Sequence, residues 1–265
     1  MDITKRLIFH MWIPPKGSTQ YELPENLHFA CLKRFSNVFT EALFILSTDD
    51  VNDSDTLSLY KSRILSCGFN RNVTFKVIEN TMYYESLTFY NEIASKLSEL
   101  DGLTFFGHSK GLTNYHGNEE NTIYWVLASY YFNLNWMDEV ERMLLSYQQY
   151  YYGTLLSLVD TIPNRYKWYY AGTFMWINTR KLNEYGVKYD GAVVPPLVDR
   201  SYSELFPGNM TDRYPVAGSH GFKFYCYGND YNAAKERALG LCDESEVEGF
   251  ETFVRDMTSE AGIAL

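Results

Sequence analysis

The chain has 265 residues, of which 46% are hydrophobic, and a formal net charge of −10. That length is enough to bury a substantial core in one large α/β domain or two small ones. The acidic balance argues against a broad electrostatic surface for nucleic acid or an anionic membrane. Because Lys and Arg are scattered, a phosphorylated ligand would have to be bound by a few placed groups.

Strand-like and helix-like segments alternate in the first half of the chain. Four short apolar runs bounded by polar or turn residues are predicted strands: Leu7 to Ile13, Ala42 to Ser47, Val73 to Ile78 and Leu103 to Gly107. Helical patterns separate them, over Pro24 to Phe35, Asp55 to Leu65 and Glu85 to Leu100. This alternation predicts right-handed βαβ units and a mainly parallel sheet covered by helices on both faces.

The second half of the chain is less regular. A long helix is expected from Asn121 to Tyr147, followed by strands over Tyr152 to Leu158 and Trp168 to Asn178. Helical signals near Asp230 to Leu241 and Glu246 to Asp256 are expected to pack against the sheet edge. No linker or repeat interrupts the sequence, so we expect a single domain over residues 1–265.

Cysteine usage and apolar runs predict the compartment. The four cysteines are far apart, without C-x-x-C spacing: Cys31, Cys67, Cys226 and Cys242. They indicate free core thiols, not a zinc knuckle or a disulfide framework. The first residues read as a strand and not as a signal peptide, and the run from Ile123 to Met137 is interrupted by Asn133 and Asn135. We therefore expect a cytoplasmic protein with no membrane span.

Polar residues occur at the carboxyl end of each predicted strand of the first half. They are His10 to Trp12, Thr48 to Asp50, Glu79 with Asn80, and His108 to Gly111. Open α/β sheets bind ligands outside the carboxyl ends of their strands, so these residues predict a binding crevice. Structural explanations also exist, because His10 fits a core histidine and Asp49 with Asp50 fits a helix cap. Neither a Gly-x-Gly-x-x-Gly turn nor a P-loop occurs, so a nucleotide would be held by other means.

The segment from Gly107 to Gly111 permits two interpretations. It fits the Gly-x-Ser-x-Gly elbow of a serine hydrolase, with Ser109 as nucleophile and Asp199 and His220 as the later acid and base. Alternatively, Lys110 is a fixed positive charge for a phosphorylated donor. The residues after the loop are turn-forming, and the next helical pattern starts only near Asn121, which favours the second interpretation.

Several short motifs follow one another over residues 81–206. They are Glu85-Ser-Leu-Thr88, His108-Ser-Lys-Gly111, the helix from Trp125 to Trp136, the strand from Ala171 to Trp176, and Glu204. Together they resemble a family of glycosyltransferases with the nucleotide-diphospho-sugar transferase, or GT-A, fold, often encoded near surface-polysaccharide genes or in viruses. That family commonly has a His-Thr-Lys-Gly loop and a Gly-Asn-Phe-Trp-Trp strand. This chain differs at Ser109, Thr173 and Met175.

The resemblance implies a GT-A-like α/β fold and a hexosyl- or pentosyltransferase that uses a nucleotide-sugar donor. Residues 1–118 would form the nucleotide-binding half and residues 119–265 the acceptor-side half. The expected catalytic residues are Glu204 as base, and Lys110 with His108 to offset the charge of the leaving diphosphate. Residues expected at the donor are His10, Trp12, Asp49, Asp50, Glu85, Thr88, Ser109 and Gly111. Those expected on the acceptor side are Gly172 and Thr173.

The need for a metal stays open at this point. Many GT-A enzymes hold Mg²⁺ or Mn²⁺ with an Asp-x-Asp sequence at the end of the central strand, whereas this loop has His108, Ser109 and Lys110. Our hypothesis is that Lys110 replaces the metal, with Asp49 and Asp50 as the rival ligands. Alternative functions are the serine hydrolase, a sugar- or nucleotide-binding protein without catalysis, and transfer to hydroxylated bases of viral DNA, which the acidic charge disfavours.

Overall fold

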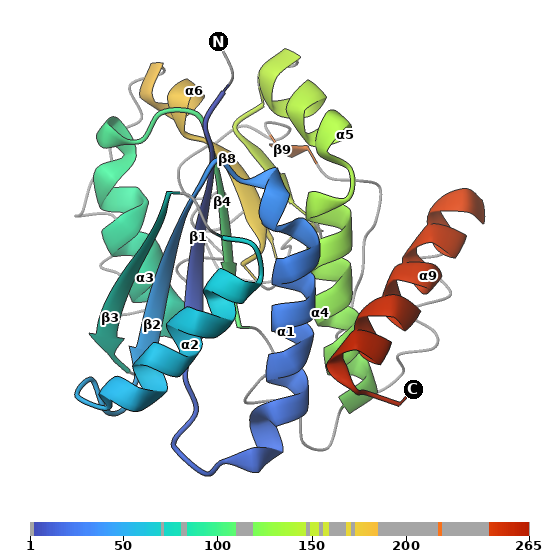
Figure 1. Cartoon of the computed structure of the whole chain (residues 1–265). Helices are drawn as coiled ribbons and strands as arrows, with labels where there is room; N and C mark the ends of the chain where they lie inside the picture. Colours follow the sequence, from blue (N-terminus) through green and yellow to red (C-terminus); the bar gives the residue numbers. More distant parts are fainter. Residues whose placement is uncertain are drawn as a thin grey trace.

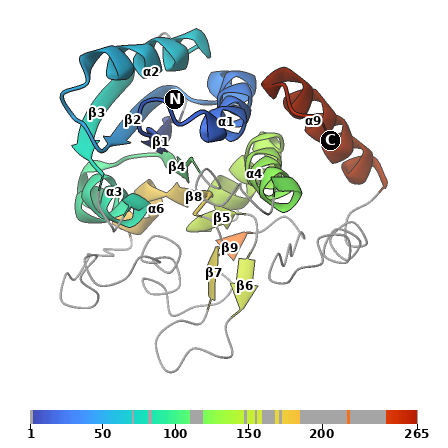
Figure 2. The same cartoon turned by 90° about the horizontal axis from the view of Figure 1, so that it is seen from below.

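The computed structural model describes an open mixed sheet with helices on both of its faces (Figures 1 and 2). The described residues are 3–69, 72–80, 84–109, 119–146, 149–153, 156–158, 168–170, 173–184, 217–218 and 244–264. Within these ranges, no helix is both long and apolar enough to cross a membrane.

Four parallel strands form the first part of the sheet: β1 (Lys5–Trp12), β2 (Glu41–Thr48), β3 (Val73–Glu79) and β4 (Leu103–His108). Three short strands extend it: β8 (Met175–Asn178), β5 (Tyr151–Gly153) and β9 (Ala217–Gly218). The strand order is β3-β2-β1-β4-β8-β5-β9, and β8 is antiparallel to both of its neighbours. A separate ladder joins β6 (Leu156–Leu158) to β7 (Trp168–Tyr170).

Helices cover the two faces of the sheet unequally. Figure 2 shows α1 (Glu22–Phe35), α2 (Ser54–Ser66) and α4 (Glu119–Leu134) on one face. The opposite face carries α3 (Tyr84–Glu92), its 3-10 extension (Ala94–Glu99) and α6 (Thr179–Glu184). The last helix, α9 (Glu244–Ala261), packs against α1 and α4. Short 3-10 turns occupy Thr19–Tyr21 and Ser36–Val38, while α5 (Met137–Glu141) runs into a π turn (Arg142–Ser146).

The core has one cluster on each side of the sheet. Phe9, Phe44 and Phe105 belong to the larger cluster, beneath α1, α4 and α9. Ile8 and Phe106, their neighbours along the strands, belong to the smaller cluster beneath α3. Adjacent strand residues are thus buried on opposite faces, as expected for parallel strands covered on both sides, and this explains why the central strands are continuously apolar.

The prediction of an α/β fold with a mainly parallel sheet flanked by helices is confirmed, as are the four first strands. The single long helix predicted from Asn121 to Tyr147 is wrong, because α4 ends at Leu134. There the Trp176 indole donates a hydrogen bond of 2.9 Å to the Asn133 carbonyl. The continuous strand predicted from Trp168 to Asn178 is also wrong. Thr173 has a φ of 59°, which interrupts an extended strand between β7 and β8.

The stretch predicted as one strand from Tyr152 to Leu158 contributes to two ladders instead. Tyr151 and Tyr152 pair with β8 in the main sheet, whereas Leu156 to Leu158 pairs with β7. The helix expected near Asp230 to Leu241 lies outside the described residues. The expected C-terminal helix is present as α9, and it is longer than predicted at both ends.

Gly102 occupies a tight junction just before β4. Its φ is 107°, and a Cβ added there would lie 2.5 Å from the Thr4 carbonyl oxygen. The Gly102 carbonyl accepts hydrogen bonds from the backbone N–H and the hydroxyl of Thr179, each 3.0 Å long. The glycine therefore connects β1, β4 and the start of α6.

Gly102→Ala should reduce the free energy of unfolding by roughly 2–4 kcal/mol, through left-handed strain plus the clash with Thr4. The matched control is Gly17→Ala, where φ is 86° but no atom lies within 4 Å of an added Cβ, so only strain of about 1 kcal/mol is expected. Urea denaturation of the two variants measures the difference. Equal losses would show that the contact with Thr4 relaxes without cost.

Candidate functional site

The order of the strands creates a switch point between β1 and β4. The chain passes from β1 outward to β2 and β3, then returns to the other side of β1 as β4. Neighbouring connections therefore leave this point in opposite directions, which opens a crevice outside the carboxyl ends of the two strands. His10 and His108 are paired directly across β1 and β4, so both lie at that edge.

Ser109 ties the two strand ends together. Its backbone N–H donates to the His10 carbonyl at 2.9 Å, which extends the β1–β4 ladder by one residue. Its hydroxyl oxygen accepts the backbone N–H of Trp12, also at 2.9 Å. Ser109 is buried, and these two bonds give it a fixed position at the start of the loop.

His10 is held by α3 in a neutral state. Its Nδ1 lies 2.8 Å from the Thr88 hydroxyl, and both side chains are buried. Burial lowers the pKa of His10 to about 4; the negative charge of Glu85 opposes this shift, and His108 adds to it. A histidine with this pKa can donate or accept a hydrogen bond near neutral pH but carries no charge.

Thr173 contributes a strained, buried hydroxyl near the same edge. It is fully buried, and its positive φ is unusual for a β-branched residue. Its neighbour Phe174 packs against His108, with ring centroids 5.7 Å apart, and this brings Thr173 close to the end of β4. Its hydroxyl has no hydrogen-bond partner among the described residues. Such strain at a strand end is characteristic of functional sites.

An aromatic pair stands where the chain leaves β1. The rings of Trp12 and Tyr21 meet edge to face, with centroids 5.1 Å apart. The Trp12 indole N–H has no acceptor within the described part of the chain. Sequence reasoning identified Trp12 but missed Tyr21, because the contact depends on how the chain returns from residue 13 to the 3-10 turn at Thr19–Tyr21.

The carboxylates after β2 accept hydrogen bonds from neighbouring residues. Asp49 and Asp50 are both exposed. Asp49 accepts a hydrogen bond of 2.9 Å from the Asn80 side chain, and Asp50 accepts the backbone N–H of Asn52 at 2.9 Å. The cap of α2 is instead Asp53. No group of three or more potential metal ligands occurs in the part of the chain that the structure describes.

The structure brings together part of the predicted site. His10, Trp12, Thr88, His108 and Ser109 meet at the ends of β1 and β4. Glu85, in the first turn of α3, acts on His10 through its charge, and Thr173 precedes Phe174, whose ring packs against His108. Asp49 and Asp50 follow β2 instead, and the bonds described above hold them there. Lys110, Gly111, Gly172, Glu204, Asp199 and His220 lie outside the described residues.

Comparison with protein families and with curated proteins adds no relative. No family model matches the chain, and no curated protein matches it. The described groups are a neutral imidazole, hydroxyls, an indole N–H and an aromatic edge, which suit a polar ligand with many hydrogen-bonding groups.

The depressed pKa of His10 makes a specific prediction for stability. The unfolded chain takes up this proton near pH 6.5, whereas the folded chain takes it up only near pH 4. The contribution of His10 is therefore fully present above pH 6.5 and is lost as the pH falls toward 4, by on the order of 3 kcal/mol. Urea denaturation of wild type and His10→Asn between pH 7 and about pH 4 measures it.

The variant should show a shallower loss of stability than wild type over that range. Asn is chosen because its side-chain amide can still bond to the Thr88 hydroxyl, which limits the cost of the substitution itself. Parallel curves for the two proteins would mean that His10 titrates normally in the folded state.

Proposed function

We propose that this chain is a glycosyltransferase that moves a sugar from a nucleotide-sugar donor to a glycan or other hydroxyl acceptor. The observation that carries the proposal is the meeting of His10, His108 and Ser109 at the switch point of a mainly parallel sheet. The motifs that resemble GT-A glycosyltransferases include the loop that begins with His108 and Ser109. Two independent lines of reasoning, sequence order and strand order, thus favour the same crevice.

The donor is proposed to bind across the ends of β1 and β4. The Trp12 indole N–H and the Trp12–Tyr21 pair supply a donor and an aromatic edge for a nucleoside. Neutral His10, oriented by Thr88, supplies a hydrogen bond without charge. Because His10 is neutral, it cannot offset the charge of a diphosphate. The proposal gives that role to Lys110, the residue after Ser109 in the sequence.

The transfer forms a bond between the acceptor oxygen and the anomeric carbon and breaks the bond from that carbon to the diphosphate. The bonding electrons leave with the diphosphate, and the acceptor loses its hydroxyl proton. In our proposal Lys110, with His108, stabilises the leaving group as its charge develops, and Glu204 takes the proton if the reaction inverts configuration. Gly172 and Thr173 are proposed on the acceptor side.

The serine hydrolase is the second candidate, and the geometry of Ser109 disfavours it. A nucleophile elbow holds its serine on a strained turn with the hydroxyl exposed. Ser109 is instead buried and continues the β1–β4 ladder, and its oxygen already accepts the Trp12 N–H. A strained elbow is also absent at Ser109, because the described non-glycine residues with positive φ are Asn72 and Thr173.

The first test measures thermal stability with UDP-, GDP-, dTDP- and CMP-sugars, each with Mn²⁺, with Mg²⁺ and with a chelator. A ligand that binds only the folded state raises the midpoint, so one donor class should give a selective shift. If Lys110 replaces a metal, the shift should persist in the chelator. Lys110→Met should reduce it strongly, because the charge opposite the diphosphate is lost.

The matched control is Lys61→Met on α2, which removes the same charge from a different element. It should leave the donor-induced shift unchanged. Absence of a shift with every nucleotide would contradict the proposal, and an equal reduction in both lysine variants would remove the role given to Lys110. Binding without sugar transfer to any acceptor would favour a binding protein without catalysis.

A fluorophosphonate probe separates the two enzyme classes. Such probes label an activated serine, and the proposal expects none at position 109 because nothing in the described residues activates that hydroxyl as a nucleophile. Wild type and Ser109→Ala should therefore give equal labelling by mass spectrometry. A label present only in the wild type would support the hydrolase.

A further inference from the structure

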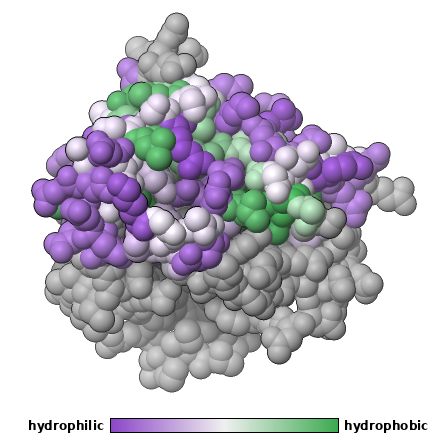
Figure 3. Space-filling model, turned by 60° about the horizontal axis from the view of Figure 1, so that its bottom comes forward, coloured by the Kyte–Doolittle hydropathy of each residue, from purple (hydrophilic) through white to green (hydrophobic). Residues whose placement is uncertain are grey.

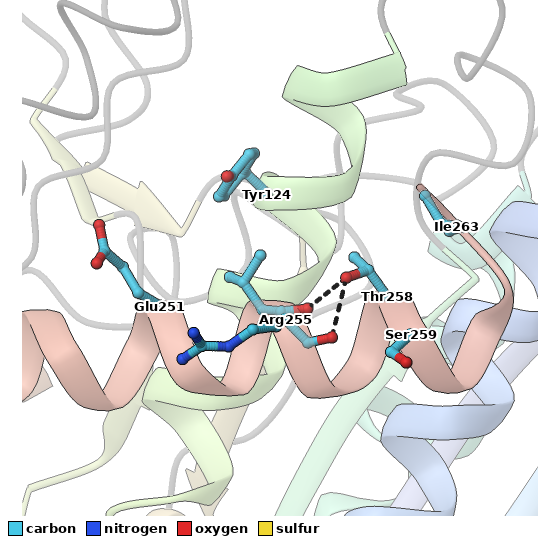
Figure 4. Close-up of a pocket in the computed structure, with 7 residues that line it drawn as sticks. Tyr124, Glu251, Arg255, Thr258, Ser259 and Ile263 are labelled. Atoms are coloured by element: carbon cyan, nitrogen blue, oxygen red, sulfur yellow. Dashed lines mark hydrogen bonds between the residues drawn. The ribbon is translucent and has the colours of Figure 1, made fainter. Parts of the chain in front are cut away.

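A hollow lies between α4 and α9, apart from the β1–β4 crevice (Figure 4). Its volume is about 430 Å³, within the range of roughly 300–1,000 Å³ that is typical of small-molecule sites. The lining residues are Tyr124, Glu251, Val254, Arg255, Thr258, Ser259 and Ile263. Figure 4 shows Tyr124 projecting from α4 over α9, which supplies the other side of the hollow together with the segment that follows it.

One part of this lining is apolar. Val254 and Ile263 are buried, and Tyr124 is half-buried. The Thr258 hydroxyl donates back to α9, with the Val254 carbonyl at 2.8 Å and the Arg255 carbonyl at 3.2 Å. Since its hydrogen is used inside the helix, Thr258 contributes shape more than a donor group. A ligand therefore meets an aromatic ring and an aliphatic floor.

The rest of the lining is polar but has no net charge. Glu251 and Arg255 are one helical turn apart on α9, and both are exposed. Arg255 also donates to the Thr252 hydroxyl at 3.2 Å, which helps to fix its guanidinium group. The pair offers acceptors and donors side by side, and Ser259 adds an exposed hydroxyl. The two opposite charges nearly cancel for an ion bound beside them, so the lining does not select an anion or a cation, and a neutral ligand with donors and acceptors fits it.

A pyranose has these properties. Its ring has an apolar C–H face, its edge has hydroxyls that both donate and accept, and a neutral hexose has no charge.

The position of the hollow also suits an acceptor sugar. Figure 1 shows the C-terminus, just beyond Ile263, at the same end of the molecule as the carboxyl ends of β2 and β3. On the face seen in Figure 3, small hydrophobic patches interrupt a mostly hydrophilic described surface.

We infer that the hollow between α4 and α9 binds a neutral hexopyranose unit of the glycan acceptor, with Tyr124 stacked on the sugar and Glu251 and Arg255 bonded to its hydroxyls. That the bound sugar belongs to the acceptor rests on the proposed glycosyltransferase function. Sugar binding at Tyr124 is independent of that function, because it follows from the lining of the hollow alone. Sequence reasoning assigned Tyr124 no role, since it lies in a helix otherwise rich in core aromatics.

The test uses saturation-transfer NMR on the full chain with the methyl α- and β-glycosides of glucose, galactose and mannose. At least one of them should receive saturation on its ring C–H protons. Tyr124→Ala should weaken its binding about tenfold, because an aromatic contact worth roughly 1.4 kcal/mol is lost. Tyr124→Phe keeps the ring and should retain binding. Glu251→Gln should weaken binding, whereas Glu248→Gln, on the same helix but outside this hollow, should not.

The donor-induced thermal shift is measured on the same variants to separate the two proposals. A normal donor shift without saturation of any glycoside, or with equal binding by wild type and Tyr124→Ala, overturns the inference and leaves the transferase standing. Glycoside binding that depends on Tyr124, together with no shift for any nucleotide-sugar, supports the sugar site and overturns the transferase. Loss of binding in Tyr124→Phe as well as Tyr124→Ala would show that the ring is not the contact, and would overturn the stacking that we infer.

Discussion

The double pairing of β1 is the constraint on which the rest of the structure depends. Its backbone is hydrogen-bonded to β2 on one side and to β4 on the other, and five consecutive residues from Leu7 to Met11 are buried. A strand enclosed in this way has no free edge and no exposed face. A ligand can therefore approach β1 only near its ends, and the same holds for β4. The position of the crevice follows from this enclosure.

The enclosure also determines the electrostatic character of the crevice. His10 lies inside the buried part of β1, where a charged imidazole would lose its hydration, so it stays neutral and is satisfied by Thr88. The Trp12 backbone N–H donates to the Ser109 hydroxyl oxygen just beyond the last ladder bond between the two strands. The described end of the crevice is consequently rich in hydrogen-bonding groups, with Glu85 as a charge that acts on it from α3.

The sequence predicted the first four strands of the sheet well, because each of them is an apolar run with clear boundaries. It also predicted that a crevice would form at the carboxyl ends of these strands, where the structure pairs His10 with His108. It did not predict the break after Leu134, which depends on the Trp176 indole reaching the Asn133 carbonyl from another part of the chain. Thr173 was expected within a strand, and its left-handed backbone has no local signal because threonine does not favour that conformation.

The two proposed binding sites also differ in how far the sequence predicts them. A site at the ends of parallel strands can be inferred from sequence, because topology brings those residues together whatever their side chains are. The contact of Tyr21 with Trp12 and the hollow under Tyr124 depend on how helices dock, which residue spacing does not encode. Docking of α9 against α1 and α4 places Arg255 and Glu251 in the same hollow as Tyr124, which lies more than 100 positions earlier in the chain. A hollow formed in this way can change its lining without disturbing the buried strand that fixes the β1–β4 crevice.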